Sequence, residues 1–179
     1  AAVAIAWSAT LERAFYPIVV ASQAVPLPVL APLIVIFLGY GLAPKIVLIT
    51  LICFFPIVVS TVDGLRGVDR DLPDLLRSFG ATRRQIFVKV RWPAALPFFF
   101  SGLRVAAAVS VIGAVFGELV GASVGLGYYI RDQVPRFRTA EVYVATLILA
   151  LMGVALFLLV RGAEWLLLPW RRGAGGRGR

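Results

Sequence analysis

The chain has 179 residues, of which 60% are hydrophobic and only 15% charged, and its mean hydropathy is +0.92. Soluble domains carry about 25% charged and 45–50% apolar residues, so this composition excludes an ordinary water-soluble domain. The chain contains no histidine and one cysteine, Cys53, which excludes histidine-based catalysis, His/Cys metal sites and internal disulfides. We therefore expect no metal and no cofactor.

Long uncharged runs indicate membrane-spanning helices. A helix needs roughly 17–25 mainly apolar residues to cross a bilayer. We predict that residues 1–9 are the end of a partial span whose beginning is missing, and that residues 14–24 form an interfacial helix. Full spans are predicted for residues 25–40, 46–62, 98–119 and 140–168. The expected fold class is an all-α polytopic membrane protein of about five spans.

The domain organisation follows from these spans. Residues 1–168 form the predicted transmembrane domain, interrupted by a polar segment at about 63–97, and residues 169–179 form a basic Gly/Arg-rich tail. Lysine and arginine in short loops mark the cytoplasmic side of membrane proteins. The basic segment 66–91 and the tail are therefore both predicted to be cytoplasmic, with residues 121–138 outside.

The net charge of +9 raises the alternative of a nucleic-acid partner. The cations cluster in the loop between spans and in the tail, where they orient the protein and attract anionic lipid. This distribution favours a membrane role, and we expect no nucleic-acid partner.

The polar segment contains two consecutive helix-start patterns. Asp71 is the predicted N-cap of a first helix, whose Leu72, Leu75, Leu76 and Phe79 follow the i, i+3, i+4, i+7 spacing of one apolar stripe. Gly80 comes directly after the stripe and fits the left-handed position that ends a helix.

A second helix is predicted after the glycine. The residues from Thr82 to Gln85 match the T-x-x-Q capping box. Ile86, Phe87 and Val90 form the apolar face of this helix, and Pro93 is expected to end or kink it. The loop is therefore predicted to be a helix, a glycine turn and a second helix.

Three interpretations of this helical pair remain open. A DNA-reading helix-turn-helix has the same outline, but its place between two membrane spans argues against it. An amphipathic pair lying on anionic lipid is the simplest interpretation. A docking element for a cytoplasmic partner is the third.

The spacing within the loop resembles that of the permease subunits of bacterial ABC importers. Their pattern is Glu-Ala-Ala, three residues, Gly, nine residues and Ile-x-Leu-Pro. The chain has Asp74-Leu75-Leu76, three residues, Gly80, nine residues and Val90-Arg91-Trp92-Pro93. The acidic residue, the glycine, the branched aliphatic residue and the proline keep their spacing. Asp for Glu, Leu-Leu for Ala-Ala and Trp for Leu are departures.

Further segments extend the resemblance over nearly the whole chain. Residues 79–87, 93–97, 101–106 and 125–128 are similar to the nitrate/sulfonate/taurine-type branch of these permeases. Residues 111–118 resemble most the carriers of thiamine-pyrimidine precursors or riboflavin.

The resemblance implies a fold like that of type I importer permeases and a multi-pass location in a bacterial inner membrane with the C-terminus in the cytoplasm. It implies a second permease copy, an external substrate-binding protein and a separate cytoplasmic ATPase. The implied substrate is a small polar or anionic solute. The residues that would couple to the ATPase are Asp74, Leu75, Leu76, Phe79, Gly80, Ala81, Thr82 and Arg84.

The ATP site itself is expected on another chain. The sequence has no G-x-x-x-x-G-K-[ST] loop and no Gly-Lys pair, so it lacks the phosphate cradle. We therefore predict a non-catalytic transport subunit. The apolar stripe alone does not decide whether Leu72, Leu75 and Phe79 face a partner or pack on the chain's own helices.

Few polar residues lie within the spans. Glu118 is a candidate for the transport pathway or a gate, and its alternative is a carboxylate that is hydrogen-bonded or paired with Arg131. Ser110 is a second pathway candidate, although a hydroxyl bonding its own helix backbone is commoner. Arg104 is expected to snorkel to the cytoplasmic interface.

Two other function classes remain. A self-contained secondary carrier or channel would also be a helical membrane protein, but such proteins usually show internal repeats and midplane charges. A purely structural membrane anchor would not need a capped pair of helices in its loop.

Overall fold

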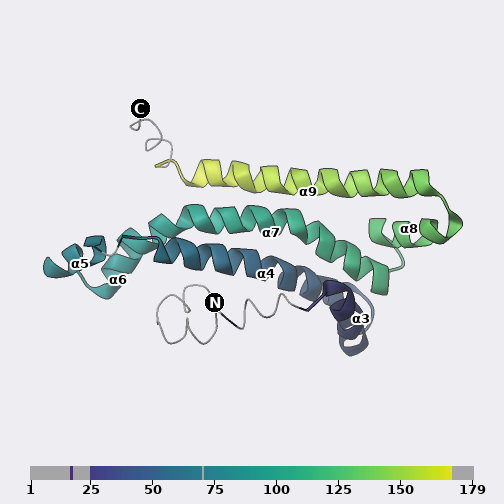
Figure 1. Cartoon of the computed structure of the whole chain (residues 1–179), viewed down its shortest axis with the longest axis horizontal. Coiled ribbons are helices and arrows are strands. Elements are labelled where there is room, and N and C mark those ends of the chain that lie inside the picture. Colours follow the sequence, from purple (N-terminus) through teal and green to yellow (C-terminus); the bar gives the residue numbers. More distant parts are fainter. Residues whose placement is uncertain (1–16, 18–24, 70, 171–179) are drawn as a thin grey trace.

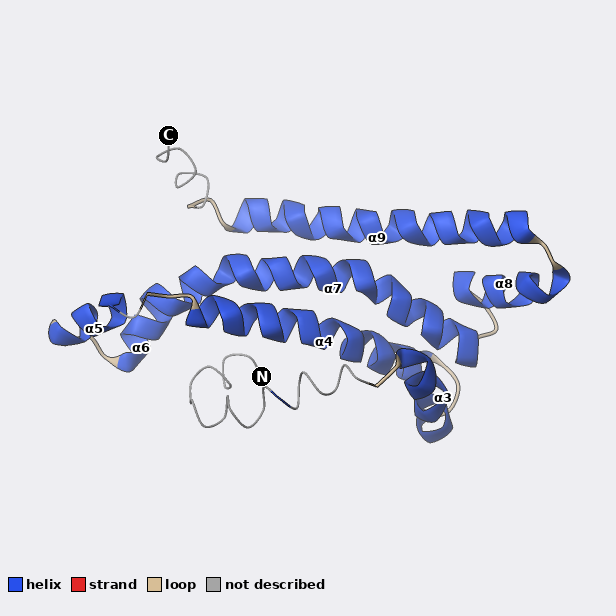
Figure 2. Cartoon of the chain, viewed as in Figure 1, coloured by secondary structure: helices blue, strands red, loops and turns tan. Residues whose placement is uncertain are grey.

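The computed structural model describes residue 17 and residues 25–69 and 71–170. Every regular element in these ranges is a helix, which confirms the all-α prediction (Figure 2). The partial span at 1–9, nearly all of the expected interfacial helix at 14–24 and tail residues 171–179 lie outside the described residues.

Three helices in the described ranges are long and apolar enough to cross a membrane. They are α4 (Leu42–Arg66), the helix that ends with α7 (Trp92–Gly121) and α9 (Thr139–Leu167). They correspond to the spans predicted at 46–62, 98–119 and 140–168. The first two extend beyond the predicted range at both ends, and α9 matches its range to within one residue.

The first predicted full span is shorter than expected. Instead of residues 25–40, α3 covers Leu27–Leu38. At 1.5 Å per residue this helix is about 18 Å long, against about 30 Å of bilayer hydrocarbon. Pro26 precedes the helix, and Gly39 ends it with a φ of +74°, a conformation that other residues rarely adopt.

The long helices form a layer in which α7 lies between α4 and α9 (Figure 1). Glycines of α7 allow its close approach to α4: Gly102 faces Pro56 and Ile57, and Gly113 faces Ile49. Helix α9 packs on α7 and on the short helix α8 (Leu126–Gln133), which continues into a 3-10 turn at Val134–Arg136.

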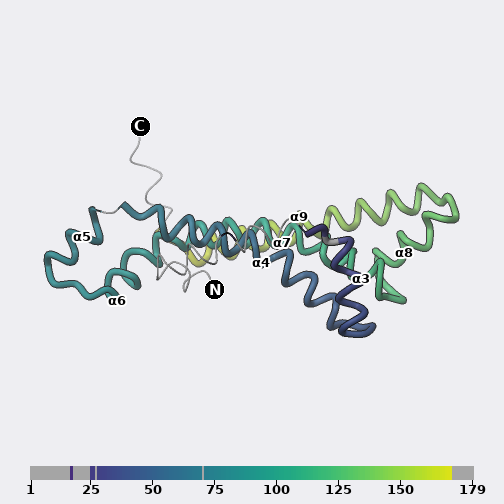
Figure 3. Tube along the Cα trace, turned by 60° about the horizontal axis from the view of Figure 1, so that its bottom comes forward, coloured from purple at the N-terminus to yellow at the C-terminus, as the bar shows by residue number. Residues whose placement is uncertain are grey.

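The two ends of this layer differ. One end carries the short helices α5 (Asp71–Ser78) and α6 (Arg83–Ile86) together with the last turns of α9, and the other end carries α3 and α8 (Figures 1 and 3). The polar loop and the end of α9 therefore lie on the same side of the spans.

Pro93 does not end the second loop helix, contrary to one expectation. Residues Arg83–Gly121 form one continuous helix, with a π-helical turn at Phe87–Arg91 between α6 and α7. In this turn the Trp92 amide donates to the carbonyl of Phe87, five residues back. Pro93 follows this turn as the second residue of α7, inside the continuous helix and not at its start. The loop is thus joined to a membrane span without a break.

Candidate functional site

The first helix of the polar loop begins close to the predicted position. Asp71 is the first residue of α5, and its amide donates to Asp69 Oδ1 at 3.2 Å. Asp69 therefore supplies the carboxylate expected from Asp71, which itself lies in the first turn. Asp74 forms an exposed ion pair with Arg77 at 2.7 Å, one turn further along.

Gly80 ends α5 in the way the sequence indicates. Its φ is +80°, and its amide donates to the carbonyl of Arg77 at 2.9 Å. The Ala81 amide donates to the carbonyl of Leu76 at 3.0 Å. These two bonds are the Schellman motif, in which a left-handed residue lets the chain fold back over the last helical turn.

The predicted capping box of α6 is confirmed. Thr82 Oγ1 accepts from the Gln85 amide at 3.3 Å, and Gln85 Oε1 accepts from the Thr82 amide at 2.8 Å. Ala81 is the single residue between the Schellman glycine and this cap. The turn between α5 and α6 is therefore fixed by hydrogen bonds on both sides.

The loop presents its apolar stripe to the outside. Leu72, Leu75 and Phe79 are 44%, 55% and 79% exposed, and Leu76 is half-buried. The loop is anchored instead by Pro73 and Ile86, which are buried. Leu75 and Phe79 thus have more than half of their surface open in the described part of the chain, whereas Leu76 is partly covered, and Arg84 is also exposed.

Replacing Thr82 by alanine tests how much the capping box contributes. Loss of an N-cap side chain costs about 0.5–2 kcal/mol. We expect Thr82→Ala to raise amide hydrogen exchange in residues 82–86, with little change in the thermal stability of the membrane helices. Thr82→Ser keeps the acceptor and serves as the control. Equal protection in both variants would show that the cap does not hold the turn.

Glu118, a candidate for the transport pathway or a gate, lies at the end of the layer that carries α8, away from the polar loop. Its Oε2 accepts from the Gly127 amide at 2.8 Å, in the first turn of α8. Gly125, the N-cap, has a φ of +122° and lies against the carboxylate, where a Cβ would overlap it. The geometry matches the hydrogen-bonded alternative, because the carboxylate meets the positive end of a helix.

Arg131 and Ser110 bond to backbone rather than to carboxylates. Arg131 donates to the carbonyls of Leu119 at 2.6 Å and Ala122 at 3.4 Å, and its guanidinium lies over the Tyr128 ring. It therefore holds the end of α7 instead of pairing with Glu118. Ser110 donates to the carbonyl of Ala107 at 2.8 Å, within its own helix.

Comparison with known proteins identifies the family. Residues 1–172 match the family described as binding-protein-dependent transport system inner membrane component. The chain belongs to this family. The match covers the membrane helices and the capped loop together, so the resemblance noted from the loop spacing holds for the whole described fold.

Several relatives are transport permease proteins. The chain is 42% identical over 166 residues to the formylaminopyrimidine transport permease protein of Halalkalibacterium halodurans, covering 93% of the chain and 66% of the relative. It is 40% identical to the riboflavin transport system permease protein of Chloroflexus aurantiacus, covering 89% and 60%. It is 32% identical to the taurine transport system permease protein of Escherichia coli, covering 94% and 61%. The chain thus spans less than two thirds of the length of these relatives.

One polar pair of this family member was not expected from its sequence. Arg104 Nη1 of α7 lies 3.1 Å from Glu164 Oε2 of α9, and the two side chains are 24% and 8% exposed. Arg104 also lies over the Phe157 ring, 5.9 Å from its centroid. The structure thus gives the Arg104 guanidinium a partner that the sequence did not indicate, a buried carboxylate near the C-terminal end of α9. The available signal was the presence of the Glu164 carboxylate within the predicted span 140–168.

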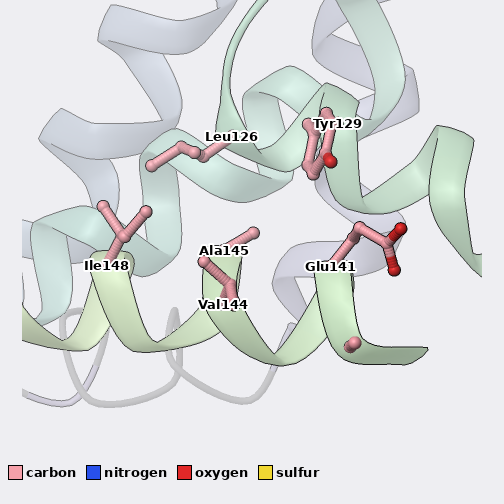
Figure 4. Close-up of a pocket in the computed structure, with 7 residues that line it drawn as sticks. Leu126, Tyr129, Glu141, Val144, Ala145 and Ile148 are labelled. Atoms are coloured by element: carbon pink, nitrogen blue, oxygen red, sulfur yellow. The ribbon is translucent and has the colours of Figure 1, made fainter. Parts of the chain in front are cut away.

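A cavity of about 370 Å³ lies between α8 and α9 (Figure 4). Its lining residues are apolar except for Tyr129 of α8 and Glu141 of α9, which Figure 4 shows on facing helices. Neither Glu118 nor Ser110 lines it. The sequence-derived pathway candidates and this cavity are thus separate features of the structure.

Proposed function

We propose that the chain is the membrane-spanning subunit of an ATP-driven importer, and that its α5–α6 loop docks on a separate cytoplasmic ATPase. The observation that carries the proposal is the exposed apolar stripe of Leu72, Leu75 and Phe79 on a turn fixed by two caps. An exposed apolar patch of this kind marks an interaction surface. A rigid turn also loses little conformational entropy when it binds.

The connection to the membrane supports coupling. The loop runs without a break through the π-helical turn into α7, so a force applied at the dock reaches a membrane span directly. The sequence carries no phosphate-binding loop, so the nucleotide site belongs to the partner. A second permease copy and an external substrate-binding protein complete the proposed complex in a bacterial inner membrane, with the C-terminus in the cytoplasm.

The proposed substrate is a small polar or anionic solute. The relatives are transport proteins for formylaminopyrimidine, riboflavin and taurine by name, and this range supports a class rather than one compound. Uptake of these three compounds by the reconstituted complex distinguishes among them. Accumulation of none of them would exclude these three compounds as the substrate.

A charge placed on the stripe tests the dock. We expect Leu75→Asp to weaken co-purification of the ATPase by roughly tenfold or more, because losing a hot-spot contact costs about 2 kcal/mol or more and the new charge would be buried in the interface. Ser78→Asp is the matched control. It adds the same charge to exposed α5 outside the stripe, and we expect ATPase binding within about twofold of wild type.

The importer proposal also predicts strict dependence on ATP and on partners. Vesicles that hold the permease, the ATPase and the binding protein should accumulate substrate only with ATP inside the compartment that the ATPase faces. Transport by the permease chain alone, without ATP, would contradict the proposal and support a self-contained carrier.

A further inference from the structure

The connection between α8 and α9 (the tip, residues 134–138) closes with the same motif that ends α5. The Phe137 amide donates to the carbonyl of Val134 at 3.1 Å. The Arg138 amide donates to the carbonyl of Gln133 at 3.3 Å. These two bonds form a Schellman motif around residue 137, whose φ of +54° and ψ of +25° are left-handed. Where α5 has Gly80 at this position, the tip has a phenylalanine.

The left-handed conformation is strained for Phe137. A residue with a Cβ meets a neighbouring carbonyl oxygen in this conformation, which glycine avoids. Among the described residues, Phe137 is the one residue other than glycine with a positive φ. It is 88% exposed, so packing within the described chain does not offset the strain. Because backbone outliers of this kind cluster at functional sites, Phe137 is a candidate contact residue.

The tip is held in one conformation by side chains as well as by its backbone. The Asp132 carboxylate accepts from Arg136 Nη2 at 3.0 Å and from Gln133 Nε2 at 2.9 Å. Gln133 is itself buried at the end of α8. These contacts fix the tip to α8 while the Phe137 side chain stays exposed. A preorganised aromatic side chain of this kind loses little conformational entropy on binding.

The tip lies beyond the apolar part of α9. The uncharged run 142–160 is about 28 Å long as a helix, close to the roughly 30 Å of bilayer hydrocarbon. Phe137 precedes this run by five residues, and the charged residues Arg138 and Glu141 lie between them. The connection between α8 and α9 is at the end of the layer opposite α5 and α6 (Figure 1). The tip is therefore outside the hydrocarbon, on the side opposite the polar loop.

The charges beside Phe137 indicate the chemistry of a partner. Arg136 and Arg138 are both exposed. Within the part of the chain that the structure describes, Arg138 forms no ion pair. Aromatic residues and arginine are enriched in protein–protein interfaces. A protein surface with an apolar pocket rimmed by carboxylates is complementary to this tip.

We propose that the tip docks on the external substrate-binding protein, with Phe137 as its central contact in an apolar pocket rimmed by acidic residues. This inference rests on the proposed function, which supplies the binding protein as a partner. It adds the surface of the chain that meets this partner. The headgroup layer of a bilayer also accepts aromatic and cationic side chains. It imposes no fixed backbone conformation on them, so the strained and anchored tip favours a protein.

Replacing Phe137 by glycine separates docking from folding. The probe is the binding protein with which wild-type vesicles show ATP-dependent uptake, and its Kd is measured on the purified permease–ATPase complex. We expect Phe137→Gly to weaken binding at least tenfold, because the central contact is lost. The same variant should raise the thermal unfolding midpoint by about 2 °C or more, because glycine removes the left-handed strain. Phe137→Tyr keeps the ring and should bind within about threefold of wild type.

Tyr143→Ala is the matched control. Tyr143 is an exposed aromatic residue at the same end of α9, but it lies inside the uncharged run and within a regular helix. We expect this variant to bind the binding protein within about threefold of wild type. An equal loss in Phe137→Gly and Tyr143→Ala would show a general effect of interfacial aromatic residues and would remove the specific role of the tip.

Thiol labelling distinguishes the protein partner from lipid. Val134 is exposed within the tip, so Val134→Cys, in a Cys53→Ala background, places a thiol beside Phe137 without removing it. The complex is held in nanodiscs of phosphatidylcholine and phosphatidylglycerol and treated with a water-soluble maleimide. We expect the permease to be labelled without the binding protein and protected when the binding protein is saturating. No labelling in either state would place the tip in lipid and overturn the inference.

Three further results would also overturn it. They are full affinity in Phe137→Gly, a lower unfolding midpoint in that variant, and a thiol at 134 that the saturating binding protein does not protect. The proposed function is tested separately by the wild-type complex. If no binding protein gives ATP-dependent uptake with wild type, the importer proposal fails. If wild type takes up substrate but the variants behave adversely, only the inference about the tip fails.

Discussion

Gly102→Ala should strongly destabilise the permease, although it adds a single methyl group. A Cβ at this position would overlap the Pro56 carbonyl oxygen and lie 2.9 Å from Ser60 Cβ and 3.0 Å from Ile57 Cα. Two of these three contacts are with backbone atoms, which cannot move away by a rotamer change as the end of a side chain can. Overpacking typically costs about 1–3 kcal/mol and occasionally more, and contacts with backbone place this variant at the upper end.

Gly162→Ala is the matched control for this prediction. Gly162 lies within α9, and a Cβ there would meet no atom of the described chain within 4 Å. Alanine is favoured over glycine inside a helix by about 1 kcal/mol. We therefore expect opposite shifts in the thermal unfolding midpoint of the purified permease in detergent. Equal midpoints for the two variants would show that α4 and α7 separate easily at Gly102.

Local sequence patterns predicted the parts of the fold that depend on neighbouring residues. The cap at Thr82 and the turn at Gly80 both satisfy backbone groups within a few residues, and each was predicted at the correct position. The long spans followed from uncharged runs, because a helix in lipid must bond its own backbone and cover it with apolar side chains. The start of α5 was predicted less well, because the carboxylates of Asp69 and Asp71 are equivalent as hydrogen-bond acceptors at a helix start.

Contacts between distant residues were not predictable in the same way. Arg104 and Glu164 lie 60 positions apart, and the sequence around each residue does not indicate which helix packs against it. The same reason explains why Arg131 was expected near Glu118 but instead bonds the carbonyls of Leu119 and Ala122. The exposure of Leu72, Leu75 and Phe79 also required the structure, since a stripe has the same spacing whether it packs inward or faces a partner.

The second large predicted effect is the loss of function on replacing Gly80, in the turn between α5 and α6. Under the proposed function, Gly80→Val should reduce ATP-dependent uptake by about tenfold or more, while the membrane helices stay folded. A Cβ at Gly80 meets nothing within 4 Å in the chain, so the loss comes from its φ of +80°. The left-handed conformation costs about 1–2 kcal/mol for a residue with a side chain, and more for a β-branched one.

Gly80→Asn separates this strain from simple bulk. Asparagine adopts the left-handed conformation more readily than other residues with a side chain, so the two amide bonds to Arg77 and Leu76 should survive. We expect uptake and ATPase co-purification within about threefold of wild type for this variant, with the loss confined to valine. If Gly80→Asn loses as much uptake as Gly80→Val while both variants remain folded, the cause is a lack of space between residue 80 and the partner, and not backbone strain. Because the surface around Gly80 is open in the chain itself, that space would have to be filled by the docked ATPase.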